Sequence, residues 1–346
     1  MITVAIDSEH TRQTNAGTAR YSRSLLKALH ARDDIKAIEV GGGNLVKRGT
    51  LRKRLLTARQ EFLWYPRLGR RSAAAKGADI YHCPAQRAPL TRGKPPLVVT
   101  IHDLIPLLAP ETMTPWNRFY SRATLRAMLD AADLIVAVSA NTANDLNTLL
   151  RISASRIRIV WNGVDDIFFS PTSLPAPPIT NSYVLFVGTP EPRKNLPRLI
   201  EAMAMLRGRG FPHRLVIAGG EGWGSVNTDA DKVDFLGRVS DESLRALYAG
   251  ASCLALPSLH EGFGLTAAEA MAVGTPVLAG ARGALPEIVG NAGILVDPYD
   301  TGAISRGIER AITERDSLIP MGLARAKLFS WKKAAAEMVG VYGELV

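Results

Sequence analysis

Residues 256–276 read LPSLHEGFGLTAAEAMAVGTP and hold two carboxylates, Glu261 and Glu269, with seven residues between them. The stretch follows a short apolar run typical of a buried strand, turns through glycine-rich EGFG, and continues in helix-forming residues. We expect a loop at the carboxyl end of a strand and then a helix capped by Thr266. The first amides of such a helix and its dipole form an anion site, most naturally for phosphate.

Short apolar runs alternate with helical patterns along the rest of the chain. We expect strands at residues 2–6, 38–40, 80–82, 97–101, 134–138, 157–160, 183–187, 214–218, 233–236, 253–256, 276–279 and 293–296. Helices are expected between them, for example at 116–132 and 140–149. This alternation predicts an α/β protein with parallel sheets covered on both faces, in two Rossmann-like doubly wound domains. The proline-rich residues 170–183 predict a linker, so we divide the chain into a domain at 1–172, a linker at 173–182 and a domain at 183–329. Ligands of such sheets bind at the carboxyl ends of the strands, in a cleft between the domains.

Composition narrows the class of protein. Of the 346 residues 47% are hydrophobic and 21% are charged, which is typical of a globular protein and not of a disordered one. No apolar run approaches the length of a membrane span, and the start MITVAIDSEH lacks the basic region of a signal peptide. The two cysteines, Cys83 and Cys253, are too few and too far apart for a disulfide framework or a zinc site. We therefore expect a cytoplasmic protein with reduced thiols and no metal site.

Positive charge gathers in the first half of the chain. Residues 1–175 hold 25 Lys and Arg against 14 Asp and Glu, and residues 47–76 alone hold ten basic residues and one acid, Glu61. Leucines and the aromatic residues Phe62, Trp64 and Tyr65 are interleaved with these charges. The pattern suits an anionic membrane surface, and it equally suits a solvated helix whose apolar side packs on its own domain. Nucleic-acid binding is disfavoured because no nucleic-acid motif accompanies the charges.

The sequence HEGFGLTAAEAMAVGTPVLA resembles the E-x7-E signature of retaining glycosyltransferases of family 4, which have the GT-B fold. LFVGTPEPRKNLPRLIEAM, RLVIAGGEGW, GALPEIVGNAGILVDPYD and, in the first half, VVTIHDLIPL resemble further stretches of that family and stand in its order. The resemblance covers more than 300 residues. It implies two Rossmann-like domains that face a central cleft, with the donor in the C-terminal domain and the acceptor in the N-terminal one. It also implies that the final helix, at residues 330–346, returns to the N-terminal domain.

The resemblance further implies an enzyme, a retaining hexosyltransferase that needs no metal and no cofactor and uses a nucleotide-diphosphate sugar as its substrate. Carried over by position, Glu269 holds the ribose of the nucleotide and Glu261 contacts hydroxyls of the donor sugar. Arg193 and Lys194 neutralise the diphosphate, whose negative charge grows as it leaves. One position departs from the family pattern: many relatives have Gly-Arg where this chain has Gly188 and Thr189.

Other positions of the implied site come from the loops and from the N-terminal domain. The expected donor-binding set also includes Phe263, Gly264, Leu265, Gly17, Gly188, Gly237, Arg238 and Val239, with Arg282 as a less certain addition. His102 follows the strand LVVTI and is expected near the donor sugar or the acceptor hydroxyl. Gly17 lies between the first strand and the first helix, where a glycine allows close approach of the backbone. Asp103, which directly follows His102, either takes part in the site or caps or orients the chain.

The chemistry leaves alternatives open. We expect departure and attack on the same face of the sugar, because the family pattern provides no carboxylate beneath the anomeric carbon for a double displacement. The sequence most resembles bacterial mannosyltransferases of polysaccharide or glycolipid assembly, which makes GDP-mannose the leading donor and a saccharide or lipid-linked molecule the acceptor. Contact with the cytoplasmic membrane face is expected through residues 47–76. A non-hydrolysing sugar-nucleotide epimerase and a non-catalytic nucleotide-sugar-binding or membrane-associated protein are the alternatives.

Overall fold

The computed structural model describes residues 1–12, 17–44, 51–112, 115–170, 179–220 and 232–346, and only the backbone of residues 54, 112 and 115–117. It divides into unit 1, Met1–Gly163 with Trp331–Val346, and unit 2, Val164–Ser330. The division therefore lies before the linker that the sequence suggests at 173–182, most of which is outside the described residues. The physical reason is that Val164 pairs with Ser330 in a parallel bridge, and the ring of Phe168 packs edge-on against Tyr248, 5.9 Å between centroids.

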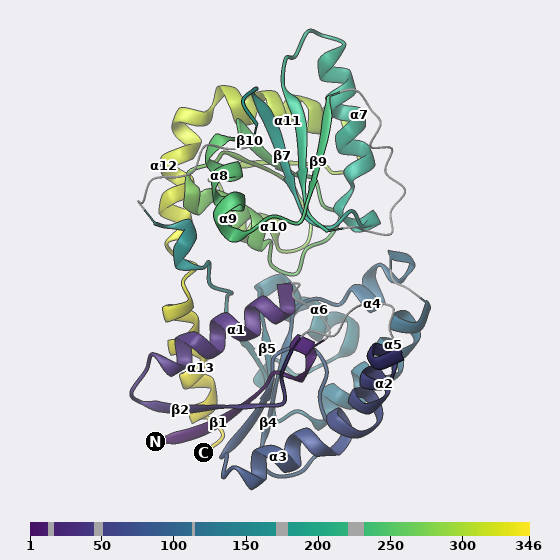
Figure 1. Cartoon of the computed structure of the whole chain (residues 1–346), viewed down its shortest axis with the longest axis vertical. Coiled ribbons are helices and arrows are strands. Elements are labelled where there is room, and N and C mark those ends of the chain that lie inside the picture. Colours follow the sequence, from purple (N-terminus) through teal and green to yellow (C-terminus); the bar gives the residue numbers. More distant parts are fainter. Residues whose placement is uncertain (13–16, 45–50, 113–114, 171–178, 221–231) are drawn as a thin grey trace. The chain divides into compact units, whose positions relative to one another are not determined.

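Unit 1 is built on a sheet of six parallel strands in the order β2-β1-β3-β4-β5-β6 (Figure 1). The strands are β1 (Ile2–Asp7), β2 (Ile35–Val40), β3 (Ile80–Cys83), β4 (Leu97–Ile101), β5 (Leu134–Ala137) and β6 (Ile157–Ile159). Every residue of β3, β4 and β5 is buried, so the central strands are covered on both faces. This is the arrangement that continuous apolar runs predict.

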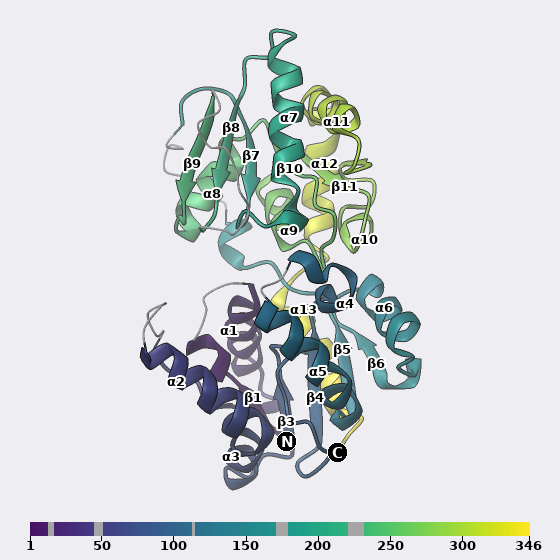
Figure 2. The ribbon, with the colours of Figure 1, turned by 90° about the vertical axis from the view of Figure 1, so that its right-hand side faces the viewer.

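Helices cover both faces of this first sheet. They are α1 (Gly17–His30), α2 (Leu51–Arg59), α3 (Gly69–Ala75), α4 (Ile105–Leu108), α5 (Pro115–Ala131), α6 (Ala140–Leu150) and α13 (Trp331–Gly343). The π-helix η2 (Gln60–Leu68) joins α2 to α3, and single turns lie at η1 (Glu9–Arg12), η3 (Pro110–Thr112) and η4 (Ala154–Arg156). α1 and α13 pack together on one face, and α2, α3 and α5 lie on the other (Figures 1 and 2). A hydrogen bond of 2.8 Å between Tyr342 Oη and His82 Nδ1 ties α13 to β3.

Unit 2 repeats the design with the strand order β12-β11-β10-β7-β8-β9, again all parallel. The strands are β7 (Tyr183–Val187), β8 (Arg214–Ala218), β9 (Val233–Gly237), β10 (Cys253–Leu256), β11 (Val277–Gly280) and β12 (Ile294–Val296). The helices are α7 (Leu196–Arg207), α8 (Asp241–Gly250), α9 (Leu265–Val273), α10 (Leu285–Val289), α11 (Thr301–Thr313) and α12 (Arg315–Ala326), with the single turns η5 (Asp166–Phe168) and η6 (Pro192–Lys194). α7 packs on α11, and α9 packs on α8 and α12 (Figure 2).

All twelve expected strands are confirmed, with small differences at their ends. β2 begins at Ile35, three residues earlier than predicted, because the charged and exposed Lys36 and Glu39 interrupt its apolar residues and hide the strand from a search for continuous apolar runs. That is the pattern of a strand at the edge of a sheet, where β2 lies. β11 begins at Val277 and not at Pro276, since proline has no N–H to give to the ladder and here only accepts, from Leu254 N at 2.8 Å.

The strand orders fix where each sheet opens for a ligand. In unit 2 the chain moves outward from β7 to β9 and then returns to build β10, β11 and β12 on the other side. The loops after β7 and β10 therefore lead to opposite halves of the sheet from neighbouring strands, and ligands of such sheets bind at the carboxyl ends of the two strands where the order reverses. In unit 1 the equivalent reversal lies between β1 and β3.

Candidate active site

Residues predicted for the donor site gather at the reversal point of unit 2. The loop after β7 carries Arg193 and Lys194, and the loop after β10 carries Glu261. The two loops are joined by a backbone hydrogen bond of 2.7 Å from Leu259 N to Arg193 O. Asn195 strengthens the junction, because its side-chain amide donates to Pro257 O at 3.0 Å and to Pro298 O at 2.6 Å.

Glu261 lies at the centre of an ion-paired cluster. Lys194 Nζ donates to its Oε1 at 2.6 Å, and Arg193 Nη1 donates to its Oε2 at 3.1 Å. Ser258, which is fully buried, donates its hydroxyl to the same Oε1 at 2.7 Å. Arg193 also pairs with Glu191, 2.9 Å from Nε to Oε2. Two cations and two carboxylates thus meet in one place, next to the start of the helix that follows Glu261.

Burial by itself would raise the pKa of Glu261, because a carboxylate loses hydration inside a protein. The neighbouring Lys194 and Arg193 and the hydrogen bonds outweigh that effect and lower the pKa to about 2. The group is therefore an anion at every physiological pH, and both of its oxygens are engaged by cations.

The helix α9 begins where the motif predicts, with a different cap. Its N-cap is Gly264, in a left-handed conformation with φ 96°, and Thr266 lies inside the helix, so the expectation that Thr266 caps it is wrong. A side chain at position 264 would be strained, and its Cβ would come within 2.7 Å of Leu285 Cδ2. Phe263 is buried against Phe329, so the loop is held firmly before the helix. The amides of Phe263, Gly264 and Leu265 therefore have fixed positions at the start of a nine-residue helix.

Glu269 is one turn further along α9 and is almost wholly buried. Its Oε2 accepts a hydrogen bond of 3.0 Å from the hydroxyl of Tyr248 on α8. The sequence marks Glu269 by the E-x7-E spacing but gives no sign of Tyr248, because the contact joins two helices. The roles of Ser258 and Asn195 were also missed, although Ser258 lies two residues after β10 and Asn195 is the N-cap of α7.

Glycines bring the ends of three strands together at this edge of the sheet. Gly188, which follows β7, has φ 146°, and Gly237, the last residue of β9, has φ 66°. A Cβ on Gly219 would lie 2.1 Å from Gly188 O, so only glycine permits this approach. Arg238 and Val239 directly follow Gly237. A Cβ atom added to Gly220 would lie 3.2 Å from Arg238 Nε and 3.9 Å from Thr189 Oγ1. The side chains of Arg238 and Thr189 therefore approach the same point beside Gly220. Arg282 lies over the ring of Tyr299 at 5.3 Å.

The predicted residues of unit 1 lie at the carboxyl edge of the first sheet. His102 follows β4, and its Nε2 donates to Pro84 O at 2.7 Å while its ring packs edge-on against Tyr21. Burial lowers the pKa of His102, although the bond to Pro84 opposes this. Asp103 lies just before Leu104, the N-cap of α4, and its Oδ1 accepts a hydrogen bond of 3.1 Å from Ile105 N. Gly17 is the exposed first residue of α1, and the preceding residues 13–16 are outside the described part of the chain.

Another histidine of this edge was not predicted. His10 follows β1, is buried, and its Nε2 lies 3.0 Å from Ser22 Oγ on α1. Its position after the first strand is the signal that a reading of strand ends would have used. Within the described ranges, no group of three or more His, Cys, Asp or Glu residues is placed to hold a metal ion.

The sequence matches the models of two protein families, one over each half of the chain. Residues 16–167 match the description "Glycosyltransferase Family 4" and residues 175–322 match "Glycosyl transferases group 1". The chain is 32% identical over 284 residues to O-antigen chain mannosyltransferase B of Escherichia coli, which covers 76% of this chain and 74% of that protein. It is also 32% identical to the MMP alpha-(1->4)-mannosyltransferase of Mycolicibacterium hassiacum and to a D-inositol 3-phosphate glycosyltransferase of Salinispora tropica. Those matches cover 61% and 72% of this chain but only 54% and 59% of the relatives.

Solved structures agree on the fold. Sucrose-phosphate synthase of Thermosynechococcus elongatus has a TM-score of 0.73 at 22% identity, over 100% of this chain and 99% of that one. HepE of Anabaena, solved in complex with UDP and glucose, has a TM-score of 0.71 at 20% identity, over 99% of this chain and 100% of that one. The fold is GT-B, and the chain belongs to the family 4 glycosyltransferases. It is a glycosyltransferase that takes a sugar from a nucleotide sugar.

Proposed function

We propose that the protein is a retaining, metal-independent hexosyltransferase that moves mannose from GDP-mannose to a saccharide or lipid-linked acceptor. The observation that carries the proposal is the meeting of Arg193, Lys194 and the start of α9 at the reversal point of unit 2.

The diphosphate of the donor is assigned to these cations and amides. A helix start with rigid N–H groups suits the distal phosphate, and a guanidinium with an ammonium suits the charge that develops as the phosphate leaves. Lys194 and Arg193 come from one short turn, η6, so they are preorganised relative to each other. Two fixed cations provide the electrostatic stabilisation that a metal ion provides in other enzymes of this kind. Arg238 is proposed to add a third cation in place of the arginine that Thr189 replaces.

Glu269 is proposed to hold the ribose of the nucleotide. A carboxylate accepts hydrogen bonds from two neighbouring hydroxyls, and the Tyr248 hydroxyl on Oε2 fixes the plane of this one. Backbone of Gly188, Gly237 and Val239 lies at the carboxyl ends of β7 and β9, the two strands on either side of β8, which suits contact with the nucleotide base and phosphates.

Retention is proposed to occur by attack on the face from which the phosphate departs. The bond from the anomeric carbon to the phosphate oxygen breaks, the acceptor oxygen bonds to the same carbon, and the departing phosphate takes the acceptor proton. A double displacement requires a carboxylate with a nucleophilic oxygen, and both oxygens of Glu261 are bound by Lys194, Arg193 and Ser258. Glu261 is better suited to accept hydroxyl hydrogens of the sugar. A glycosyl adduct trapped on Glu261 would contradict this route.

Unit 1 is proposed to bind the acceptor. His102 donates from Nε2 to Pro84 O, so its neutral ring keeps Nδ1 as an acceptor for a hydroxyl. Because burial lowers the pKa of His102, the neutral form is the one expected at pH 7. The exposed start of α1 at Gly17 is a second polar contact point.

Mannose is favoured by the names of two relatives, which are mannosyltransferases. An anionic membrane surface is proposed as a further partner, through residues 47–76, which makes the protein peripheral on the cytoplasmic membrane face. The described part of the chain contains no helix with the length and apolarity to cross a membrane.

Thermal stabilisation by UDP, GDP, ADP, dTDP and their sugar conjugates, without metal, tests the donor. Ligand at about 100 times its Kd stabilises the folded state by roughly 2.7 kcal/mol, which gives a readable shift. We expect GDP-mannose to stabilise the wild type but not Glu269→Gln, while Glu309→Gln on α11, whose partly exposed side chain pairs with Arg209, behaves as wild type. Proton NMR of the first product formed should show the α anomer. Stabilisation by another base, or an inverted product, would overturn the corresponding part of the proposal.

A further inference from the structure

An apolar stripe runs along the outer side of α2 and η2. Leu51, Leu55, Phe62 and Leu63 are all exposed, Leu51 by 71% and Phe62 by 64%. Leu51 and Leu55, four residues apart, lie on one side of α2, and Phe62 and Leu63 are the exposed apolar side chains at the start of η2. Large apolar side chains that gather in this way mark an interaction site more often than single ones do.

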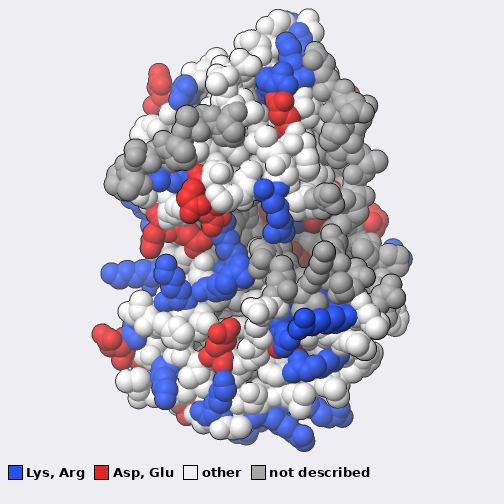
Figure 3. All heavy atoms as spheres, in the orientation of Figure 1, with Lys and Arg blue, Asp and Glu red and all other residues white. Residues whose placement is uncertain are grey.

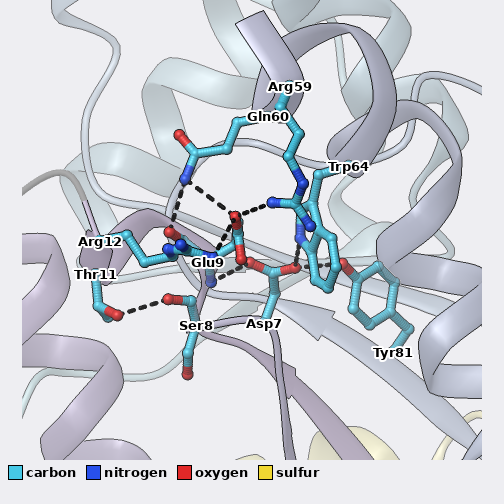
Figure 4. Close-up of polar contacts among 9 residues, drawn as sticks. All are labelled: Asp7, Ser8, Glu9, Thr11, Arg12, Arg59, Gln60, Trp64 and Tyr81. Atoms are coloured by element: carbon cyan, nitrogen blue, oxygen red, sulfur yellow. Dashed lines mark hydrogen bonds and ion pairs between the residues drawn. The ribbon is translucent and has the colours of Figure 1, made fainter. Parts of the chain in front are cut away.

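The opposite side of the same segment is bonded to the rest of unit 1, at and just after the end of β1. Trp64 Nε1 donates to Asp7 Oδ2 at 2.7 Å, and Gln60 Nε2 donates to Glu9 O at 2.9 Å (Figure 4). Arg59 forms an ion pair of 2.5 Å with Glu9. These contacts hold the segment on the carboxyl end of β1, so the stripe is a defined surface of the fold.

The charged side chains of the segment around the stripe are almost all positive. Residues 51–76 contain eight Lys and Arg and a single acid, Glu61, which is buried and paired with Arg87. Arg52, Arg67 and Arg71 are exposed. Figure 3 views unit 1 at 90° to this side, and there too Lys and Arg cover more of its surface than Asp and Glu.

Arg87 joins this segment to the start of α5. It pairs with Glu61 on η2 and lies 5.2 Å from the ring centre of Tyr120 on α5. The neighbour of Tyr120, Phe119, is exposed by 68%, and Arg118 and Arg122 are exposed as well. α2 and α5 lie on the same side of unit 1, which faces the viewer in Figure 2.

We propose that α2, η2 and the start of α5 form one docking face for an anionic lipid surface, with Phe62, Leu63 and Phe119 inserted among the headgroups. This rests on the membrane contact of the proposed function and names the face that makes it. Aliphatic and aromatic side chains within a basic rim suit a bilayer interface, where apolar burial and headgroup charge act together. Nucleic acid would leave the apolar stripe unused. A symmetric dimer would set the same positive face against itself.

Co-sedimentation of the full chain with vesicles tests the face. We expect binding to vesicles of phosphatidylcholine with about a third phosphatidylglycerol, and loss of it on pure phosphatidylcholine. Each Lys or Arg near such a surface strengthens binding about fivefold, so Arg67→Glu with Arg71→Glu should weaken it by more than about 25-fold. Phe62→Ser with Leu63→Ser should weaken it at least about tenfold. The matched controls are Met205→Ser and the pair Arg315→Glu with Lys327→Glu, all exposed in unit 2, and they should bind as wild type.

Stabilisation by GDP, measured on the same variants without vesicles, separates this proposal from that of the donor site. We expect it to be unchanged, which also shows that the variants are folded. Absence of wild-type binding to anionic vesicles, or equal binding by Phe62→Ser with Leu63→Ser, would overturn the docking face while leaving the glycosyltransferase function intact. A dimer in solution that depends on Phe62 would assign the face to a second copy instead.

Discussion

Replacing Glu261 by Gln removes the anion at the centre of the cluster while keeping its shape. The pKa of about 2, in place of the ordinary 4.5, means that the folded protein favours the carboxylate by about 3 kcal/mol relative to the unfolded chain. The variant also leaves Lys194, which is buried, without its carboxylate. We expect the free energy of unfolding at pH 7 to fall by about 3 kcal/mol.

The contribution of Glu261 to the free energy of unfolding depends on pH. Because the folded pKa is lowered, the contribution of Glu261 is present above about pH 4.5 and is lost as the pH falls toward 2. Urea unfolding should therefore show the full difference between wild type and Glu261→Gln at pH 7 and a smaller one at about pH 3. The control is Glu191→Gln, whose carboxylate contacts Arg193 nearer the surface and should change stability by less than about 1 kcal/mol.

The same variant separates structure from binding. Arg193 and Lys194 keep their charge and lose a competitor for it, so GDP should stabilise Glu261→Gln at least as strongly as wild type, while transfer of the sugar is lost. A variant as stable as wild type at pH 7 would show that the ion pairs do not sustain the loop. A variant that no longer responds to GDP would show that Glu261, and not the cations, carries diphosphate binding.

Tyr248→Phe removes the hydrogen bond that the tyrosine hydroxyl donates to the buried Glu269, and a hydrogen bond to a charged group is worth about 1.5–3 kcal/mol. The KM for the donor should therefore rise about tenfold or more, with kcat little changed. An unchanged KM would show that Glu269 does not need Tyr248 to orient it. Arg238→Ala should raise the donor KM about tenfold in steady-state assays, and if Arg238 compensates for Thr189, the added change Thr189→Arg should restore it. Burial raises the pKa of Asp7 to about 6, although hydrogen bonds from Tyr81 and Trp64 act in the opposite direction. The stability that the protonated Asp7 contributes is therefore full below pH 3.8, and about 3 kcal/mol of it is lost as the pH rises through about 6. Urea unfolding of Asp7→Asn between pH 3 and 7 should lack that loss, and a parallel decline in both proteins would refute the assignment.

The strand pattern was readable because burial on both faces forces long β-branched and apolar runs. Strands such as Leu97–Ile101 and Tyr183–Val187 agree with the expectation to the residue. Less was readable at helix starts: Thr266 looks like a cap by residue type, yet the left-handed backbone at Gly264 decides where α9 begins. That conformation depends on how the loop returns from β10, which local sequence does not encode.

The basic segment shows the same limit in another way. Its charges and aromatic residues are evident in the sequence, but the two open interpretations differ in which side of the segment faces the protein. In the structure Trp64 and Tyr65 are buried, whereas Phe62 and Leu63 are exposed. The change from α-helix to π-helix at Gln60 sets this division, because it shifts the angle between successive side chains.

By itself the sequence determined the α/β class, the twelve strands, the E-x7-E spacing and the membership of family 4, since all of these reside in local periodicity or in motifs of contiguous residues. Only the tertiary structure decided that Lys194 and Glu261, 67 residues apart, share one ion pair, and that Tyr248 holds Glu269. The physical reason is the strand order: β7 and β10 are neighbours in the sheet although α7, β8, β9 and α8 lie between them in the chain. Contacts of this kind arise from packing between elements, and no spacing in the sequence records them.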